Sequence, residues 1–154
     1  MGKDWVFWAM VGAFILHALE EQFAAGGFLK NYNDYLKKIG RAPKSFQWLY
    51  SVMLLYALPG TIIAALIGSR ILILSLGVMF GLFINAVAHF VLIIMSRKYS
   101  SGTLTGTFII IPLTIYSYYI FMSGGQLSIT GALWSFLVGG LFNIPTIPYK
   151  KLEK

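Results

Sequence analysis

The sequence predicts an all-α, polytopic membrane protein with five transmembrane helices, and three observations lead to this fold class. Of the 154 residues, 58% are apolar and 11% are charged, whereas a typical soluble domain has about 25% charged residues. The apolar residues fall in five segments of nearly membrane-spanning length, separated by short turn-forming stretches. The basic residues gather in alternate connections between these segments. We therefore expect residues 1–154 to form a single transmembrane helical-bundle domain.

Each of the five segments comes close to the ~20 apolar residues that a membrane-spanning helix needs. Their ranges are Trp5 to Ala25, Phe46 to Ile67, Ile71 to Met95, Leu104 to Met122 and Leu127 to Ile144. Merging the last two segments gives a four-span alternative. The separation of basic residues between the two sides is then lost only at the C-terminus. The small residues of GVMFG and GGLFN allow two helices to pack closely. If the two helices belong to different copies of the chain, the protein is a homodimer.

Positive charge predicts how the segments are oriented. With five spans, the side that holds the N-terminus carries two basic residues, Lys3 and Arg70, and the other side carries ten. Cytoplasmic loops are the ones enriched in Lys and Arg. We therefore expect the N-terminus outside and the C-terminus in the cytoplasm. The net charge of +7 then favours anionic membrane lipids as partners, and not nucleic acid.

The connection between the first two segments has an amphipathic pattern. In FLKNYNDYLKKIG, an apolar stripe at helical spacing alternates with polar residues; the stripe is Phe28, Tyr32, Tyr35, Leu36 and Ile39. This pattern predicts a short interfacial helix on the cytoplasmic surface, with its tyrosines at the level of the lipid headgroups. A solvated connector is the alternative.

Four ionisable residues lie inside the apolar segments: His17, Glu20, Glu21 and His89. Each costs ~2.5–3.5 kcal/mol at the centre of a membrane on insertion scales, so such groups usually face the bundle interior and find partners there. The spacings of three and four residues predict that His17, Glu20 and Glu21 share one helix face.

Two further segments place polar groups at a similar depth. Asn85 and His89 are four residues apart, and at ~1.5 Å per residue they lie as far past the middle of their segment as His17 and Glu20 do in theirs. Thr103 and Thr105 add hydroxyl groups at the start of the fourth segment. We therefore expect one polar pocket in the cytoplasmic half of the membrane.

The combination of motifs resembles a known family. His-x-x-Glu-Glu at His17 to Glu21, Asn-x-x-x-His at Asn85 to His89, and the turn Tyr99 to Gly102 are similar to the HXXEE family of small bacterial integral membrane proteins, whose function is unknown. The resemblance extends from about Leu16 to Pro112. It implies a bacterial cytoplasmic membrane and marks these positions as the site, but it supplies no reaction.

A metal-dependent membrane enzyme is the first functional hypothesis. Because the chain has no cysteine, the metal ligands would be imidazoles and carboxylates. His17, His89 and one of Glu20 and Glu21 would bind zinc or another divalent ion, and the other glutamate would be a general base that activates water. The substrate would be a lipid-like or amphiphilic molecule that enters from the inner leaflet.

Two other hypotheses use the same residues. Adjacent intramembrane carboxylates with histidines are typical of proton relays, which favours a proton-coupled transporter or a small-molecule binding membrane protein. A purely structural network of interhelical hydrogen bonds is the third interpretation. Five polar groups at one depth cost more insertion energy than helix packing requires, which favours the first two.

Overall fold

The computed structural model of the protein describes residues 2–24 and 28–146, and the regular elements in these residues are helices. In chain order they are α1 (Trp5–Phe23), α2 (Phe28–Lys38), α3 (Phe46–Tyr50), η1 (Ser51–Ala57), α4 (Leu58–Ile67), η2 (Gly68–Ile71), α5 (Leu72–Ser96), α6 (Thr103–Thr105), η3 (Gly106–Ile110), α7 (Ile111–Ser123), α8 (Ile129–Phe142) and η4 (Ile144–Thr146).

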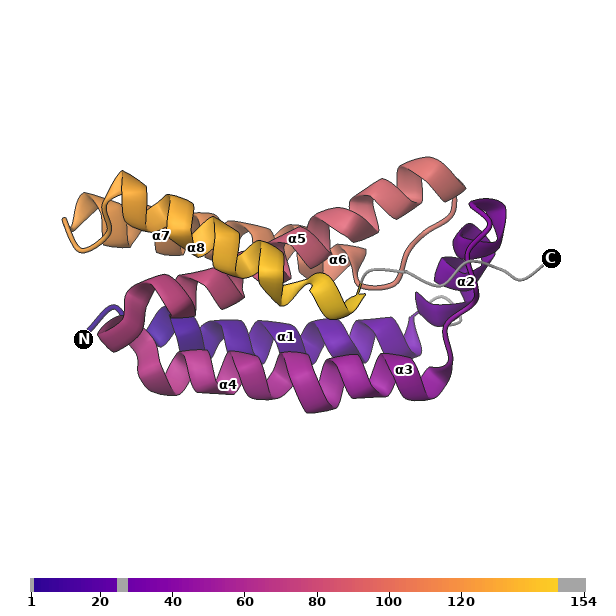
Figure 1. Ribbon diagram of the computed structural model, residues 1–154, viewed down its shortest axis with the longest axis horizontal. Helices are drawn as coiled ribbons and strands as arrows, with labels where there is room; N and C mark the ends of the chain where they lie inside the picture. Colours follow the sequence, from indigo (N-terminus) through magenta and orange to yellow (C-terminus); the bar gives the residue numbers. More distant parts are fainter. Residues whose placement is uncertain (1, 25–27, 147–154) are drawn as a thin grey trace.

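All five apolar segments are helical, as expected. The segments η1 and η3 are π-helical turns that join α3 to α4 and α6 to α7 into two continuous helices. Successive long helices run in alternating directions along the long axis of the molecule (Figure 1). Ala25, the expected end of the first segment, lies outside the described residues.

Membrane crossing by all five segments remains a prediction. Among the described residues, two helical stretches are long and apolar enough to cross a membrane, Phe46–Ser96 and Thr103–Ser123. The first of these reverses direction at η2 (Figure 1). The helix α8 has 14 residues, which is shorter than the ~20 residues of a spanning helix.

A proline lies two residues after the end of each π-helical turn. Pro59 and Pro112 lack the N–H that would bond to the carbonyl four residues earlier, and their rings clash with that carbonyl in a regular α-helix. The wider turns η1 and η3 end two residues before these prolines and relieve the clash. Both helices are therefore widened beside a proline, and η1 forms part of a cavity wall.

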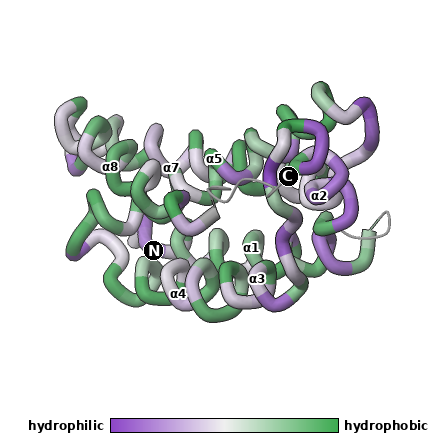
Figure 2. The backbone as a smooth tube through the Cα atoms, turned by 45° about the vertical axis from the view of Figure 1, so that its right-hand side comes forward, coloured by the Kyte–Doolittle hydropathy of each residue, from purple (hydrophilic) through white to green (hydrophobic). Residues whose placement is uncertain are grey.

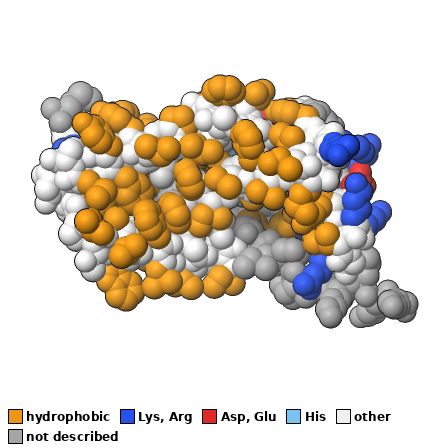
Figure 3. Space-filling view, turned by 90° about the horizontal axis from the view of Figure 1, so that it is seen from above, with side chains coloured by type: hydrophobic (Ala, Val, Ile, Leu, Met, Phe, Trp, Pro, Cys, Tyr) orange, Lys and Arg blue, Asp and Glu red, His pale blue; other side chains and the backbone are white. Residues whose placement is uncertain are grey.

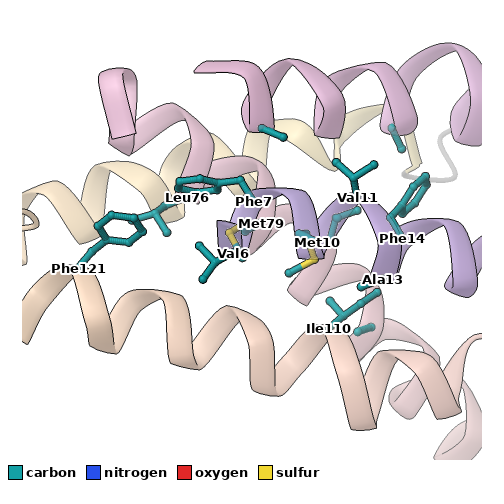
Figure 4. Packing of buried hydrophobic residues seen from close by; sticks show 14 of the residues in the cluster. Val6, Phe7, Met10, Val11, Ala13, Phe14, Leu76, Met79, Ile110 and Phe121 are labelled. Atoms are coloured by element: carbon teal, nitrogen blue, oxygen red, sulfur yellow. The ribbon is translucent and has the colours of Figure 1, made fainter. Parts of the chain in front are cut away.

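The hydrophobic core lies between α1, α5 and α7. Figure 4 shows Phe7 and Met10 of α1 packed with Met79 of α5 and Phe121 of α7, and the rings of Phe7 and Phe121 stack with centroids 5.6 Å apart. All four side chains are at most 1% exposed.

Glycines bring α5 and α8 into close contact. A Cβ on Gly139 would lie 2.7 Å from the carbonyl oxygen of Gly77, and a Cβ on Gly77 would lie 2.5 Å from Cγ1 of Val138. These glycines of GVMFG and GGLFN therefore pack two helices of the same chain. A homodimer stays a prediction without support from these residues.

The outer surface is apolar along most of its length. Figure 3 shows hydrophobic side chains along one face, with lysine and arginine gathered at one end of the molecule. The side chains of Leu55, Phe108, Ile94 and Ile129 are 71% to 77% exposed. Of the ten basic residues expected on the cytoplasmic side, Lys150, Lys151 and Lys154 lie outside the described residues.

The amphipathic helix α2 crosses the end of the bundle where the hydrophilic backbone segments gather (Figures 1 and 2). The side chain of Asn31 donates to the carbonyl oxygen of Tyr99 at 2.9 Å. The Asn33 amide bonds to both the N–H and the C=O of Lys44. The predicted amphipathic helix is therefore present, and its position at a membrane surface stays a prediction. Hydrogen bonds to two other connections hold it in place.

Candidate functional site: a buried His–Glu–His cluster

Three side chains from two helices converge in the interior. His17 and Glu21 stand one turn apart on α1, and His89 projects from α5; their exposed fractions are 1%, 4% and 2%. Oε1 of Glu21 lies 3.3 Å from Nε2 of His17 and 2.8 Å from Nε2 of His89. The two imidazole rings meet edge to face, with centroids 5.0 Å apart. The expected meeting of the first and third apolar segments is therefore confirmed.

The outer nitrogen of each imidazole contacts a hydroxyl oxygen. Nδ1 of His17 lies 2.8 Å from Oγ1 of Thr105, and Nδ1 of His89 lies 3.0 Å from Oγ of Ser100. Metal-binding histidines characteristically use their second ring nitrogen in this way, which orients the ring and selects the tautomer. Both Nε2 atoms are thereby directed toward Glu21.

The tautomer of His17 follows from the groups around Thr105. The Thr105 hydroxyl donates to Oε2 of Glu20 at 2.6 Å, because an ionised carboxylate can only accept. The hydroxyl oxygen must then accept from Nδ1 of His17, which carries the proton. In the neutral imidazole, Nε2 has a free lone pair and is the atom available to a metal.

The inner atoms of the cluster bring several possible metal ligands together. Nε2 of His17 lies 3.1 Å from Oδ1 of Asn85, and Oε1 of Glu21 is also an acceptor. Nε2 of His89 is a buried atom without a hydrogen-bond partner of acceptable geometry among the described residues. When both Nε2 atoms are unprotonated, these neighbouring lone pairs repel one another, and a cation between them removes the repulsion. The ligand atoms of His17, Glu21 and His89 all lie within 4.8 Å of one another, close enough to share one metal ion.

Glu20 does not join this cluster. Its carboxylate accepts hydrogen bonds from the backbone N–H groups of Leu104 and Thr105 at 3.1 and 2.8 Å, and from the hydroxyls of Thr105 and Tyr99. It therefore caps the helix that begins at Thr103. Adjacent residues on a helix point about 100° apart, so Glu20 and Glu21 face different helices. This differs from the expected common face for His17, Glu20 and Glu21.

Tyr99 adds a fixed donor to Glu20. Partial burial, together with the hydrogen bond to the carboxylate of Glu20, raises the pKa of Tyr99 to about 12. The phenol therefore stays protonated at neutral pH, and it helps to hold Glu20 against the start of α6.

The turn from Tyr99 to Gly102 packs against both imidazoles. Gly102 has a φ of +97°, and a Cβ at this position would lie 2.8 Å from Cε1 of both His17 and His89. Only glycine fits here without strain. Ser101 is fully buried and donates to the carbonyl oxygen of Ala24 at 2.6 Å, which joins the turn to the end of α1.

The other expected polar residues differ in position. Asn85 and Thr105 contact His17, as expected. Thr103 instead donates to the carbonyl oxygen of Ser100 at 2.6 Å and closes the turn. Ser100 and Gly102 were marked only by the family resemblance. Both residues contact His89 although they are 11 or more residues away from it in the sequence, so helix spacing could not predict these contacts.

A cavity of about 420 Å³ lies beside the cluster. His17, Glu21, Asn85 and His89 contribute its polar wall, and the rest is mostly apolar and aromatic, with contributions from α2, α3, η1 and the end of α8. Glu20 and Thr105 do not line it. The volume is in the range of small-molecule sites.

The comparisons with known proteins agree with the motif. The model of a family described as "Protein of unknown function with HXXEE motif" matches residues 8–117, which include the whole cluster. No curated protein and no solved structure matches the chain.

Proposed function

The chain belongs to the family of proteins with the HXXEE motif, whose function is unknown, and from its site we propose that it is a membrane-embedded, metal-dependent enzyme that acts on a lipid-like or amphiphilic substrate. The observation that carries this proposal is the placement of one carboxylate oxygen between two inward-facing Nε2 atoms.

The donor set suits a borderline divalent ion such as zinc. Zinc takes imidazole and carboxylate ligands at roughly 2.0–2.2 Å, so tetrahedral ligand atoms lie roughly 3.3 Å apart. The two N–O distances of 3.3 and 2.8 Å are close to this spacing. The ligands would be His17, His89 and Glu21, and the ion would act there as a Lewis acid on a substrate oxygen.

The two glutamates then have different roles. Glu21 belongs to the ligand set, whereas Glu20 positions His17 through the Thr105 hydroxyl. Asn85 both contacts His17 and lines the cavity, so its amide is available to orient a bound substrate. This assignment replaces the earlier alternative in which Glu20 was itself a ligand or a general base.

The outer surface supports a location in the membrane. Water would oppose the exposure of so many large apolar side chains along the helices, whereas acyl chains favour it. The basic residues near α2 favour the cytoplasmic side for that end, by the positive-inside rule. We place the protein in a bacterial cytoplasmic membrane with its N-terminus outside.

Elemental analysis of the purified protein tests the metal assignment. After purification with added metal, wild type is expected to hold about one divalent ion per chain. The double variant His17→Ala, His89→Ala is expected to hold none. The double variant Ser69→Ala, Ser123→Ala, which changes exposed polar residues of η2 and α7 outside the cluster, is the control and should keep its ion. Wild type without stoichiometric metal would overturn the proposal and favour a structural polar network.

One observation favours a second function, a proton-coupled carrier. A chain of contacts leads from the buried Glu21 through His17 and Thr105 to the half-buried Glu20. Such a chain could carry protons between the cavity and the surface. If a pH gradient drives uptake of a small molecule into liposomes that contain the protein, and Glu20→Gln abolishes this uptake, the carrier is favoured. A metal-bound protein without flux would favour the enzyme.

A further inference from the structure

A second cavity adjoins the first at the α2 end of the molecule. It has a volume of about 210 Å³ and lies between the α2 residues from Asn31 to Lys38 and the α5 end at Ser96 and Lys98. We call it the basic cavity, and the larger one beside the cluster the aromatic cavity. Tyr35 lines both, and on α5 the aromatic cavity ends at Met95 where the basic cavity begins at Ser96. The two cavities are therefore neighbours that share the side chain of Tyr35.

The two cavities differ in charge. The basic cavity is lined by Lys37, Lys38 and Lys98 against a single carboxylate, that of Asp34, which leaves an excess of positive charge. No lysine or arginine lines the aromatic cavity, whose ionisable groups are those of the cluster and its tyrosines. An anion is attracted to the first part, whereas an apolar chain fits the second.

The dimensions match a single lipid chain. Measured along α5 at ~1.5 Å per residue, His89 lies ~10 Å from Ser96, and Gly81 at the far end of the aromatic cavity lies ~22 Å from it. One leaflet of a bilayer has a hydrocarbon depth of about 15 Å. A chain whose headgroup lies at Ser96 would therefore pass the cluster and still end within the aromatic cavity.

We propose that the basic cavity is a headgroup site, and that the occupant of the two cavities is an amphiphile with one apolar chain and an anionic headgroup, a carboxylate or a phosphate. Binding of this amphiphile does not depend on the proposed enzymatic function, but its role as the substrate rests on that function. The headgroup lies at Lys37 and Lys98, and the part of the chain ~10 Å away lies beside His89.

Quenching of Trp48 fluorescence tests this inference, because Trp48 lines the aromatic cavity. The probes are dibrominated stearate, at a pH that ionises it, and its uncharged methyl ester. Both are added to the protein in a neutral detergent. A Trp48→Phe variant identifies the part of the quenching that comes from this site. Wild type is expected to bind the acid more tightly than the ester, and less so at high salt.

Matched charge variants locate the headgroup. The double variant Lys37→Gln, Lys98→Gln is expected to weaken acid binding roughly twofold to thirtyfold, the range for two solvent-exposed ion pairs, and to leave ester binding unchanged. The double variant Lys30→Gln, Arg97→Gln removes two charges at the same end outside the basic cavity, and should bind like wild type. Equal loss in both double variants, or equal binding of acid and ester by wild type, would overturn the inference.

Two further arms separate the alternatives. Displacement of the brominated acid by millimolar inorganic phosphate would overturn the lipid assignment, because a free anion would then be the preferred occupant. Wild type stripped of metal with a chelator is expected to keep its preference for the acid. The headgroup site and the metal assignment can therefore fail independently of each other.

Discussion

Nδ1 of His17 lies 2.8 Å from Oγ1 of Thr105, although the two residues are 88 positions apart in the chain. This contact uses the outer nitrogen of the imidazole, and the carboxylate of Glu20 on the far side of the hydroxyl determines the direction of the hydrogen bonds. If the cluster binds a metal as proposed, the availability of Nε2 therefore depends on residues outside the ligand set.

Thr105→Val tests this dependence. Valine keeps the shape of threonine but removes the hydroxyl, so His17 loses the acceptor that selects its tautomer. We expect metal affinity to fall by roughly 10-fold to 100-fold, as is typical for such outer partners. Competition with a chromophoric chelator measures the affinity. Thr107→Val on the neighbouring turn is the control, since Oγ1 of Thr107 has no hydrogen-bond partner among the described residues. An unchanged affinity in Thr105→Val would contradict the assigned role.

The two glutamates should differ when each is changed to glutamine. Glu21→Gln removes the charged ligand between the two histidines, so we expect the purified protein to lose its metal. Glu20→Gln keeps the three ligands and should retain the metal with weaker affinity, because only the orientation of His17 is affected. Elemental analysis with chelator competition distinguishes the two. Equal metal loss in both variants would show that Glu20 is a ligand after all.

Gly102→Ala should disturb both imidazoles at once. The new Cβ would lie 2.8 Å from Cε1 of His17 and of His89, at a φ of +97° that L-residues avoid. We expect a loss of at least ~1–2 kcal/mol in stability, together with weaker metal binding. Gly12→Ala on α1, where a Cβ meets nothing within 4 Å, should be neutral or stabilising by up to about 1 kcal/mol. Thermal unfolding in detergent compares the two variants, and similar melting temperatures would contradict this prediction.

Leu55→Lys tests the membrane location. Leu55 is 77% exposed near the middle of the continuous helix from Phe46 to Ile67. If acyl chains surround it, a lysine there costs ~2.5–3.5 kcal/mol, and the amount of protein in the membrane fraction should fall sharply. Ile39→Lys changes a half-exposed residue just after α2, at the basic end, and should be tolerated. Equal yields of both variants would argue against a spanning helix at Leu55.

Local chemistry alone decided much of this protein. The apolar segments and their glycine-rich or polar breaks predicted the five helical stretches, and the stripe from Phe28 to Leu36 predicted α2, because helix periodicity and turn composition act over a few residues. The pairing of His17 with Glu21 is also local, since residues four apart share a helix face.

Only the tertiary structure decided how the site is completed. The separation of Glu20 from Glu21, the contact of Ser100 with His89, and the use of Gly77 and Gly139 between α5 and α8 all depend on which helices become neighbours. The physical reason is that a helix directs adjacent side chains about 100° apart. Which neighbouring helix each side chain contacts is set by the packing of the whole bundle.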